Sequence, residues 1–395
     1  MTVRTAIGHG DYQEFAFACP KCGIEIRYGM AVDQEKIGIE YTKITNAEWL
    51  GELKSCSHVF THDGETLVPD ELPDHVTAFI ATSLLPTDAD LFHKHRQVRI
   101  HLCRKVWPAI RRSRVHLEKE NWPAFESEMN QCTQQFKLSN PLANRYHLFD
   151  LVDRFGIYFR PFHTSSRNSL VDRIEEAEKA NSAKCLELRE YLHSLGWATD
   201  LEKEYWSLKD KWIDVFFIVQ PIYLSLYWDA QSNSLDEYHL SQKRFDELRP
   251  YYASLFETLA RISVVAAGME AIISLGSLDL QAKKRLIPLD EYRKMDNGQK
   301  LQLINSLPIG PAFSELDNNR LRNGISHHSA HYEVSTDKIL YRNDAKSGTT
   351  RDEVSYTRFC EKLVNLYMQF DTAAIYIQWL CAFDLDVVRQ SVKNP

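Results

Sequence analysis

An arginine and a histidine stand five positions apart in a strongly polar stretch of the chain. The stretch reads Arg-Asn-Gly-Ile-Ser-His and runs from Arg322 to His327, with His328 directly after it. A guanidinium binds a phosphate bidentately and stabilises the negative charge that develops on it. An imidazole titrates near neutral pH and can move a proton at a hydroxyl or a leaving oxygen. Together the two side chains suit phosphodiester cleavage without a metal ion.

The spacing also limits this interpretation. On a regular helix, residues five apart lie about 140° from each other around the axis. Gly324 lies between Arg322 and His327 and favours a kink or a helix end, which would bring the two together. A structural alternative stays open, in which Arg322 caps helix carbonyls and the histidines are solvated. Glu270, in the preceding apolar segment, either orients this pair or makes a buried structural contact.

A second group of residues has the spacing of metal ligands. The run Cys19-Pro-Lys-Cys22-Gly places two thiolates on one tight turn, as a tetrahedral zinc site requires. The nearest candidates for the other two ligands are Cys56 and His58, with His62 as an alternative fourth ligand. We expect a structural zinc that holds a small β domain together. A redox-active cysteine pair is the alternative.

These residues resemble two known arrangements. The form R-N-x-x-x-H at Arg322 to His327, with an apolar helix before it and a long helix after it, resembles the HEPN superfamily over roughly residues 240–385. The cysteine turn resembles the knuckle of zinc ribbons. The HEPN resemblance implies a helical bundle and a metal-independent endoribonuclease. In that chemistry the 2′-hydroxyl of the RNA attacks the phosphate and leaves a 2′,3′-cyclic phosphate.

The resemblance also implies roles for single residues. Arg322 and His327 would be catalytic, Asn323 would support the phosphate or the backbone, and His328 would be able to replace His327. Two protomers would share one cleft, so a homodimer or a larger homo-oligomer is implied. A Tyr two residues after the His marks the short toxin branch, but this chain has Ser329. A zinc module before such a domain instead resembles larger prokaryotic antiviral or abortive-infection proteins, which implies a phage or host protein as trigger.

Positive charge is concentrated in one segment. The net charge of −7 argues against a surface that is basic all over. Residues 91–120, however, hold nine Lys or Arg against two Glu. The alternative is a solvated helix face that neighbouring acids neutralise. The candidate RNA contacts, with two Trp for base stacking, are Arg111, Arg112, Arg114, Arg320, Trp107 and Trp122.

The composition predicts a predominantly α protein. Residues 1–85 contain short alternating runs and predict a zinc-ribbon-like β domain. Residues 86–235 predict a helical region that binds substrate or a partner, and residues 236–395 a HEPN-like helical domain with a β-hairpin excursion at 331–356. Helices are expected at 87–118 (kinked or broken at Pro108), 122–137, 142–155, 166–195, 200–231, 241–276, 279–295, 297–307, 311–324 and 355–383.

The 395 residues also indicate the cellular setting. Eight cysteines are too few for a disulfide framework, and the first residues lack the apolar segment of a secretory signal. The most apolar stretch carries Arg261 and Glu270, which favours a buried helix over a membrane span. We therefore expect a cytoplasmic protein without a membrane partner.

Three functions remain in competition. The first is the metal-independent endoribonuclease acting on RNA. The second is a non-enzymatic, zinc-containing scaffold that binds nucleic acid or protein and dimerises through the helical bundle. The third is a zinc-dependent nuclease or hydrolase, which needs an open metal position.

Overall fold

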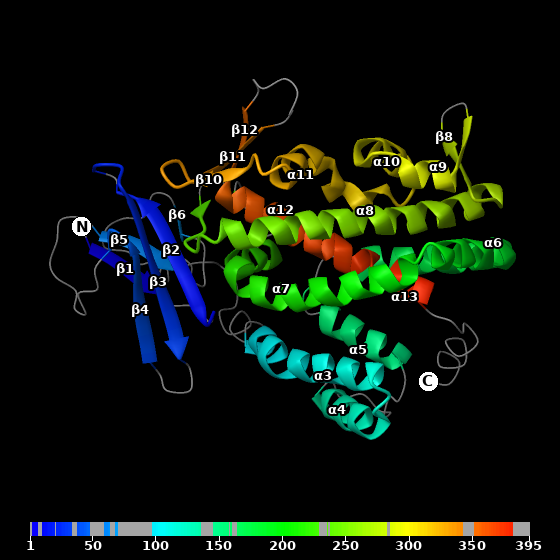
Figure 1. The fold of residues 1–395 in the computed structure, drawn as a ribbon, viewed down its shortest axis with the longest axis horizontal. Helices are drawn as coiled ribbons and strands as arrows, with labels where there is room; N and C mark the ends of the chain where they lie inside the picture. Colours follow the sequence, from blue (N-terminus) through cyan, green and yellow to red (C-terminus); the bar gives the residue numbers. More distant parts are fainter. Residues whose placement is uncertain are drawn as a thin grey trace. The chain divides into compact units, whose positions relative to one another are not determined.

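The structure is a computed structural model of the chain. It describes residues 2–6, 10–19, 21–33, 38–47, 59–63, 68–69, 97–135, 145–157, 159, 164–228, 235, 238–282, 285–342 and 351–381. The protein is predominantly helical with small β-sheets, as the composition predicts (Figure 1).

Most described residues belong to helices. Their bounds are η1 Leu102–Val106, α3 Trp107–Glu118, α4 Trp122–Gln135, α5 Arg145–Ile157, α6 Thr164–Ser194, α7 Trp197–Trp228, α8 Phe245–Leu275, α9 Leu289–Lys294, α10 Asn297–Ile304, η3 Gly310–Asn318, α11 Asn319–Ser326, α12 Tyr356–Ala373 and α13 Ile375–Cys381.

The strands are short. Their bounds are β1 Thr2–Ala6, β2 Tyr12–Ala18, β3 Glu25–Asp33, β4 Gly38–Thr45, β5 Val59–Asp63, β6 Val68–Pro69, β7 Tyr238–His239, β8 Asp279–Ala282, β9 Arg285–Pro288, β10 His331–Glu333, β11 Lys338–Arg342 and β12 Arg351–Ser355. The two three-stranded sheets are antiparallel and have the orders β2-β3-β4 and β10-β11-β12.

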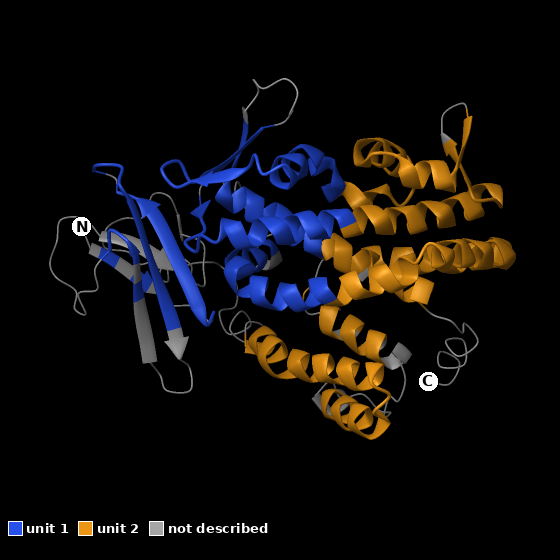
Figure 2. Ribbon diagram, viewed as in Figure 1, with its two compact units in different colours: residues 1–87, 207–257, 315–367 blue, residues 88–206, 258–314, 368–395 orange. Residues whose placement is uncertain are grey.

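The chain divides into two compact units, each built from three separate stretches of sequence (Figure 2). Unit 1 comprises residues 1–87, 207–257 and 315–367, and unit 2 comprises residues 88–206, 258–314 and 368–395. The first stretch ends close to the expected boundary at residue 85, whereas residues 86–235 and 236–395 are each divided between the two units. Both the motif helix α11 and the cysteine turn belong to unit 1.

The N-terminal sheet of unit 1 has a small aromatic core. Phe15, Phe17, Tyr28 and Met30 are buried together, and the rings of Phe15 and Tyr28 stack with centroids 5.3 Å apart. The edge of β2 pairs with the segment before α8, because the backbone N–H of Lys243 donates to the carbonyl of Glu14 at 3.0 Å. The sheet therefore shares backbone hydrogen bonds with the segment that leads into the helices of its own unit.

The hairpin after α11 is anchored by a buried lysine. Lys243 forms an ion pair with Asp337 at 2.5 Å, and its ammonium lies 4.7 Å from the ring centroid of Tyr356. The Tyr332 hydroxyl donates to the same carboxylate at 2.7 Å. A buried ammonium is tolerated only when it is paired in this way. These contacts hold the turn between β10 and β11 against the start of α12.

The strand predictions in the N-terminal region and the hairpin within 331–356 are confirmed. The prediction of a helix over 279–295 is wrong for its first part, because β8 and β9 form a hairpin there. Leu280 and Ile287 are opposite each other in this hairpin and are both buried. The run Leu-Ile-Pro in β9 suits a short strand that ends at proline, and the helix α9 begins only at Leu289.

Pro108 does not break the helix in which it lies. The residues before it form the π-helical turn η1, and Pro108 occupies one of the first two positions of α3. The first turn of an α-helix needs no backbone N–H from these positions, so proline is tolerated there. The expected start of this helix at residue 87 lies outside the described residues.

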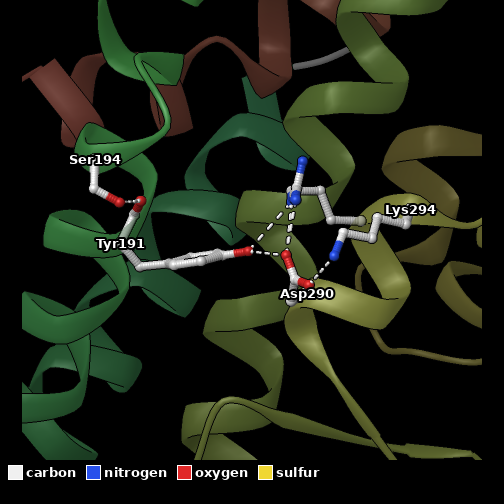
Figure 3. Close-up of polar contacts among 5 residues, drawn as sticks. Tyr191, Ser194, Asp290 and Lys294 are labelled. Atoms are coloured by element: carbon white, nitrogen blue, oxygen red, sulfur yellow. Dashed lines mark hydrogen bonds and ion pairs between the residues drawn. The ribbon is translucent and has the colours of Figure 1, made fainter.

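A surface polar network of unit 2 joins α6 to α9 (Figure 3). Asp290 accepts hydrogen bonds from the Tyr191 hydroxyl at 2.7 Å, from Arg293 at 2.8 Å and from Lys294 at 2.5 Å. These donors, the Lys294 ammonium first, hold the pKa of Asp290 well below its usual range. The network is a structural link between two helices.

We expect Asp290→Asn to lower the melting temperature of the protein at pH 7. A depressed carboxyl pKa contributes stability above the unfolded-state value of about 3.9, and this contribution is lost as the pH falls. The difference from wild type should therefore persist from pH 7 to about pH 4 and shrink only as the pH falls further, in thermal unfolding followed by circular dichroism. Asp172→Asn, at an exposed position of α6, is the control. Equal melting temperatures for wild type and Asp290→Asn at pH 7 would refute the role of this network.

Candidate active site

The motif helix α11 has a clear inner side. Leu321 and Ile325 are buried, and Arg322 lies next to them around the helix. Apolar residues four apart form one face of a helix, so they fix how α11 is rotated about its axis. The rotation turns the arginine of the motif partly toward the protein, so that 22% of its side chain is exposed.

Arg322 is held by three groups. It forms an ion pair with Glu257 of α8, and its Nη1 donates to Oδ1 of Asn323 at 2.9 Å. The guanidinium lies 5.9 Å from the ring centroid of Phe256. Its Nε is buried and has no hydrogen-bond partner among the described residues. Burial lowers the pKa of Arg322, but an arginine remains charged at neutral pH.

His327 and His328 lie at the end of α11 and are exposed. A kink or a helix end was expected at Gly324. The kink is absent, because the backbone N–H of His327 still donates to the carbonyl of Asn323 at 2.9 Å, as in a regular helix, and the helix ends two residues after Gly324, at Ser326. Within one chain Arg322 and His327 therefore remain about 140° apart around the axis. His328 has a φ of +54° and ends the helix.

Gly324 has a packing role in place of the expected kink. A Cβ at this position would lie 2.7 Å from the Cβ of Tyr341 on β11. Contacts this short do not occur, so only glycine lets the hairpin pack directly on α11. Gly324 thus allows Tyr341 to lie directly beside α11.

A carboxyl group with an unusual pKa lies just before α11. Burial raises the pKa of Glu315 to about 7, and Lys362 of α12 opposes this shift. The side chain of Asn318 joins the two: its Nδ2 donates to Glu315 at 2.8 Å, and its Oδ1 accepts from Lys362 at 2.8 Å. This cluster fixes the start of α11 to α12.

The basic helix of unit 2 is partly neutralised. Arg112 makes a bidentate ion pair with Glu128 of α4 at 2.7 and 2.9 Å. Arg114 pairs with Glu118 at 3.0 Å and lies over the ring of Trp206 at 5.3 Å from its centroid. Arg111 is exposed.

The tryptophans and Arg320 complete this set of candidate RNA contacts. Trp107 is buried, with 1% of its surface exposed, so the prediction that it stacks on bases is wrong. Trp122 is 46% exposed. Arg320, in unit 1, is exposed on α11.

A backbone hydrogen bond closes the turn between the two cysteines. The backbone N–H of Gly23 donates to the carbonyl of Cys19 at 2.8 Å, and Gly23 has a φ of +71°. The backbone N–H groups of Lys21 and Cys22 lower the pKa of the Cys19 thiol. Cys22 is exposed. The turn therefore favours a thiolate at Cys19, the form that binds zinc.

The remaining candidate metal ligands are not placed by the structure. Cys56 and His58 lie outside the described residues. His62 is in β5, paired with Thr5 of β1 in a parallel register. In the part of the chain that is described, no three or more His, Cys, Asp or Glu side chains group as a metal site.

Three side chains near the motif carry no signal in the sequence. Glu257 precedes Arg322 by 65 residues, and neither Glu315 nor Tyr341 is part of a motif. Glu270, which was a candidate for orienting the motif, instead pairs with Arg173 of α6 and is 3% exposed. Its role is the buried structural one.

Comparisons with known proteins add no assignment. No model of a known protein family matches the chain, and neither the curated proteins nor the solved structures include a significant match. Among the described residues one helix, α8, is long and apolar enough to cross a membrane, but most of that segment is buried inside the protein.

We expect Glu315→Gln to stabilise the protein above pH 7. The raised pKa means that the charged form is disfavoured in the folded state. The stability that Glu315 contributes is therefore complete below its ordinary pKa of 4.5 and lost as the pH rises through about 7. The midpoint of urea unfolding should be higher in Glu315→Gln than in wild type at pH 8, and the gain should largely disappear at pH 5.

The control for this comparison is Glu247→Gln, an exposed carboxylate of α8 that pairs with Arg244. It should show no comparable gain at pH 8. A Glu315→Gln variant that is less stable than wild type at pH 8 would show that the charged carboxylate, not its burial, is the favourable feature.

Proposed function

We propose that the protein is a metal-independent endoribonuclease with a HEPN-like helical bundle. The observation that supports this most is the pairing of an exposed histidine with a braced arginine on one short helix. His327 is open to a substrate, and Arg322 is held in a defined position by Glu257 and Asn323. A fixed guanidinium and a free imidazole are the two groups that the chemistry needs.

His327 is the general base of the proposed reaction. It takes the proton from the 2′-hydroxyl, and that oxygen attacks the adjacent phosphorus. The bond from phosphorus to the 5′-oxygen breaks, and the 5′-oxygen leaves with a proton supplied by a general acid such as a second histidine. Arg322 neutralises the charge on the phosphate oxygens. The products are a 2′,3′-cyclic phosphate and a 5′-hydroxyl.

One chain cannot supply both groups from the same side of α11. Because Arg322 and His327 are about 140° apart around the axis, the pair that acts on one phosphate comes from two chains. We therefore include a homodimer or larger homo-oligomer in the proposal. Asn323 supports Arg322 through its hydrogen bond, and the exposed His328 is the second candidate acid.

The test of this function compares RNA cleavage by wild type with that by Arg322→Gln and His327→Asn. His327→Asn should lower the rate by about 10²- to 10⁴-fold, the usual contribution of one acid–base group. Arg322→Gln should lower it by about 10²- to 10³-fold, the usual contribution of one group that stabilises developing negative charge. EDTA should leave the cleavage step unchanged. His331→Asn, at an exposed position on β10, should retain activity. A wild type that cleaves no RNA, or a fully active Arg322→Gln, would refute the proposal.

The scaffold is the second candidate, and one observation favours it. Arg322 is already engaged by a carboxylate, so it is not free to bind a phosphate as it stands. The scaffold predicts salt-sensitive nucleic-acid binding that survives His327→Asn and falls when Arg111, Arg112 and Arg114 are neutralised.

We further propose a structural zinc held by Cys19 and Cys22, with Cys56 and His58 or His62 as the remaining ligands. The hydrogen bonds in the cysteine turn and the lowered pKa of Cys19 support thiolate ligation. Zinc would hold the small N-terminal sheet, whose aromatic core has few members. On this account the protein is a cytoplasmic effector of prokaryotic antiviral defence, released by a phage or host protein.

The zinc proposal predicts one zinc per chain by elemental analysis of purified protein. Cys19→Ser and Cys22→Ser should each lower the zinc content several-fold. Cys185→Ala, which removes a buried thiol of α6, should leave it unchanged. Wild type without zinc after purification in zinc-containing buffer would refute the site.

A further inference from the structure

The outer face of α11 carries a second set of groups that face solvent. Arg320 and His327 are seven residues apart, so they lie within about 20° of each other around the axis. Both are exposed. Among the described residues no hydrogen bond or ion pair engages either side chain. Arg320, not Arg322, is therefore the cation on the same face as His327.

Tyr341 packs against α11 at Gly324, which lies between Arg320 and His327 along the helix axis. Its side chain packs on Gly324, which follows Arg320 by one helical turn and precedes His327 by three residues. The ring is partly exposed. The hairpin thus places an aromatic ring beside the helix, because Gly324 has no side chain to keep it away.

The charges around Tyr341 show how these groups are arranged. Burial raises the pKa of Tyr341, its cross-strand neighbour Asp352 raises it further, and Arg320 lowers it. Arg320 is therefore within electrostatic reach of the tyrosine hydroxyl. The negative charge of Asp352 repels a phosphate from the ring of Tyr341. The guanidinium of Arg320 is the group that attracts the phosphate.

We propose that Arg320, Tyr341 and His327 form a binding surface for single-stranded RNA, in which Arg320 contacts a phosphate and a base stacks on Tyr341. An exposed cation beside an aromatic ring is the usual combination for single-stranded nucleic acid, since the cation follows the backbone and the ring accepts any base. The surface presents the sugar of the bound nucleotide to His327. The role of His327 in this inference rests on the proposed function, whereas RNA binding by Arg320 and Tyr341 does not.

The test uses a fluorescent 2′-O-methyl RNA oligonucleotide, which has no free 2′-hydroxyl and cannot be cleaved by this route. Its binding to the full chain is measured by anisotropy between 50 and 200 mM salt. Arg320→Gln should weaken binding and lower the slope of log K against log salt by about 0.7, the value for one phosphate contact to a single strand. Tyr341→Leu should weaken binding roughly 5- to 100-fold, as expected for one stacked base.

Two controls accompany these variants. Arg342→Gln removes another exposed arginine of the same hairpin and should leave affinity and salt slope unchanged. Tyr341→Phe keeps the ring and should keep binding. Because Tyr341→Leu can disturb packing on Gly324, its melting temperature is recorded, and if it is unfolded the salt slope of Arg320→Gln decides.

The results separate the surface from the proposed function. Wild type that does not bind the oligonucleotide, or an Arg320→Gln that matches Arg342→Gln in slope and affinity, would overturn the surface. Tighter binding of a duplex than of the single strand would also overturn it. Binding that depends on Arg320 and Tyr341, in a protein that cleaves no unmodified RNA, would uphold the surface and refute the nuclease.

Discussion

The ion pair between Arg322 and Glu257 determines what α11 can present to a ligand. A partly exposed ion pair contributes only about 0–1 kcal/mol to stability when it is considered alone. Here it acts together with the burial of Leu321 and Ile325, and all three set the rotation of a helix of only eight residues. If Glu257 were removed, a half-buried guanidinium with an unpaired Nε would remain, which is a larger cost than the ion pair itself. These contacts therefore fix the position of Arg322, and the exposed histidines belong to the other side of the helix.

Ion pairs elsewhere in the protein also determine which charged side chains are available to a ligand. Two buried charges have partners of opposite charge: Lys243 pairs with Asp337, and Glu270 pairs with Arg173. In the basic segment of α3, Arg112 forms an ion pair with Glu128. Charge counted along the sequence therefore overstates the positive charge that α3 offers to RNA. Arg320 lies outside that segment and, among the described residues, does not form an ion pair as Arg112 does.

The fold was predictable where the local pattern and the packing agree. Alternation at β2 to β4 and the polar turn within 331–356 indicate strands that the structure contains. The prediction of a helix over 279–288 is wrong because a segment of this length with two buried apolar positions, Leu280 and Ile287, fits a short hairpin as well as a helix. Tertiary packing decides between them. The motif residues were found from their types and spacing. Glu257 and Tyr341 were not, because contact with α11 depends on tertiary packing that no local pattern records.

The central claim is that Arg322 and His327 act on one phosphate from two different chains. The most direct measurement co-expresses the Arg322→Gln and His327→Asn chains, each inactive alone, and assays RNA cleavage by the purified mixed oligomer. The account predicts that activity returns in the mixed oligomer, because one chain supplies the histidine and the other supplies the arginine. Mixed oligomers that form and bind RNA but remain as inactive as either parent would contradict it.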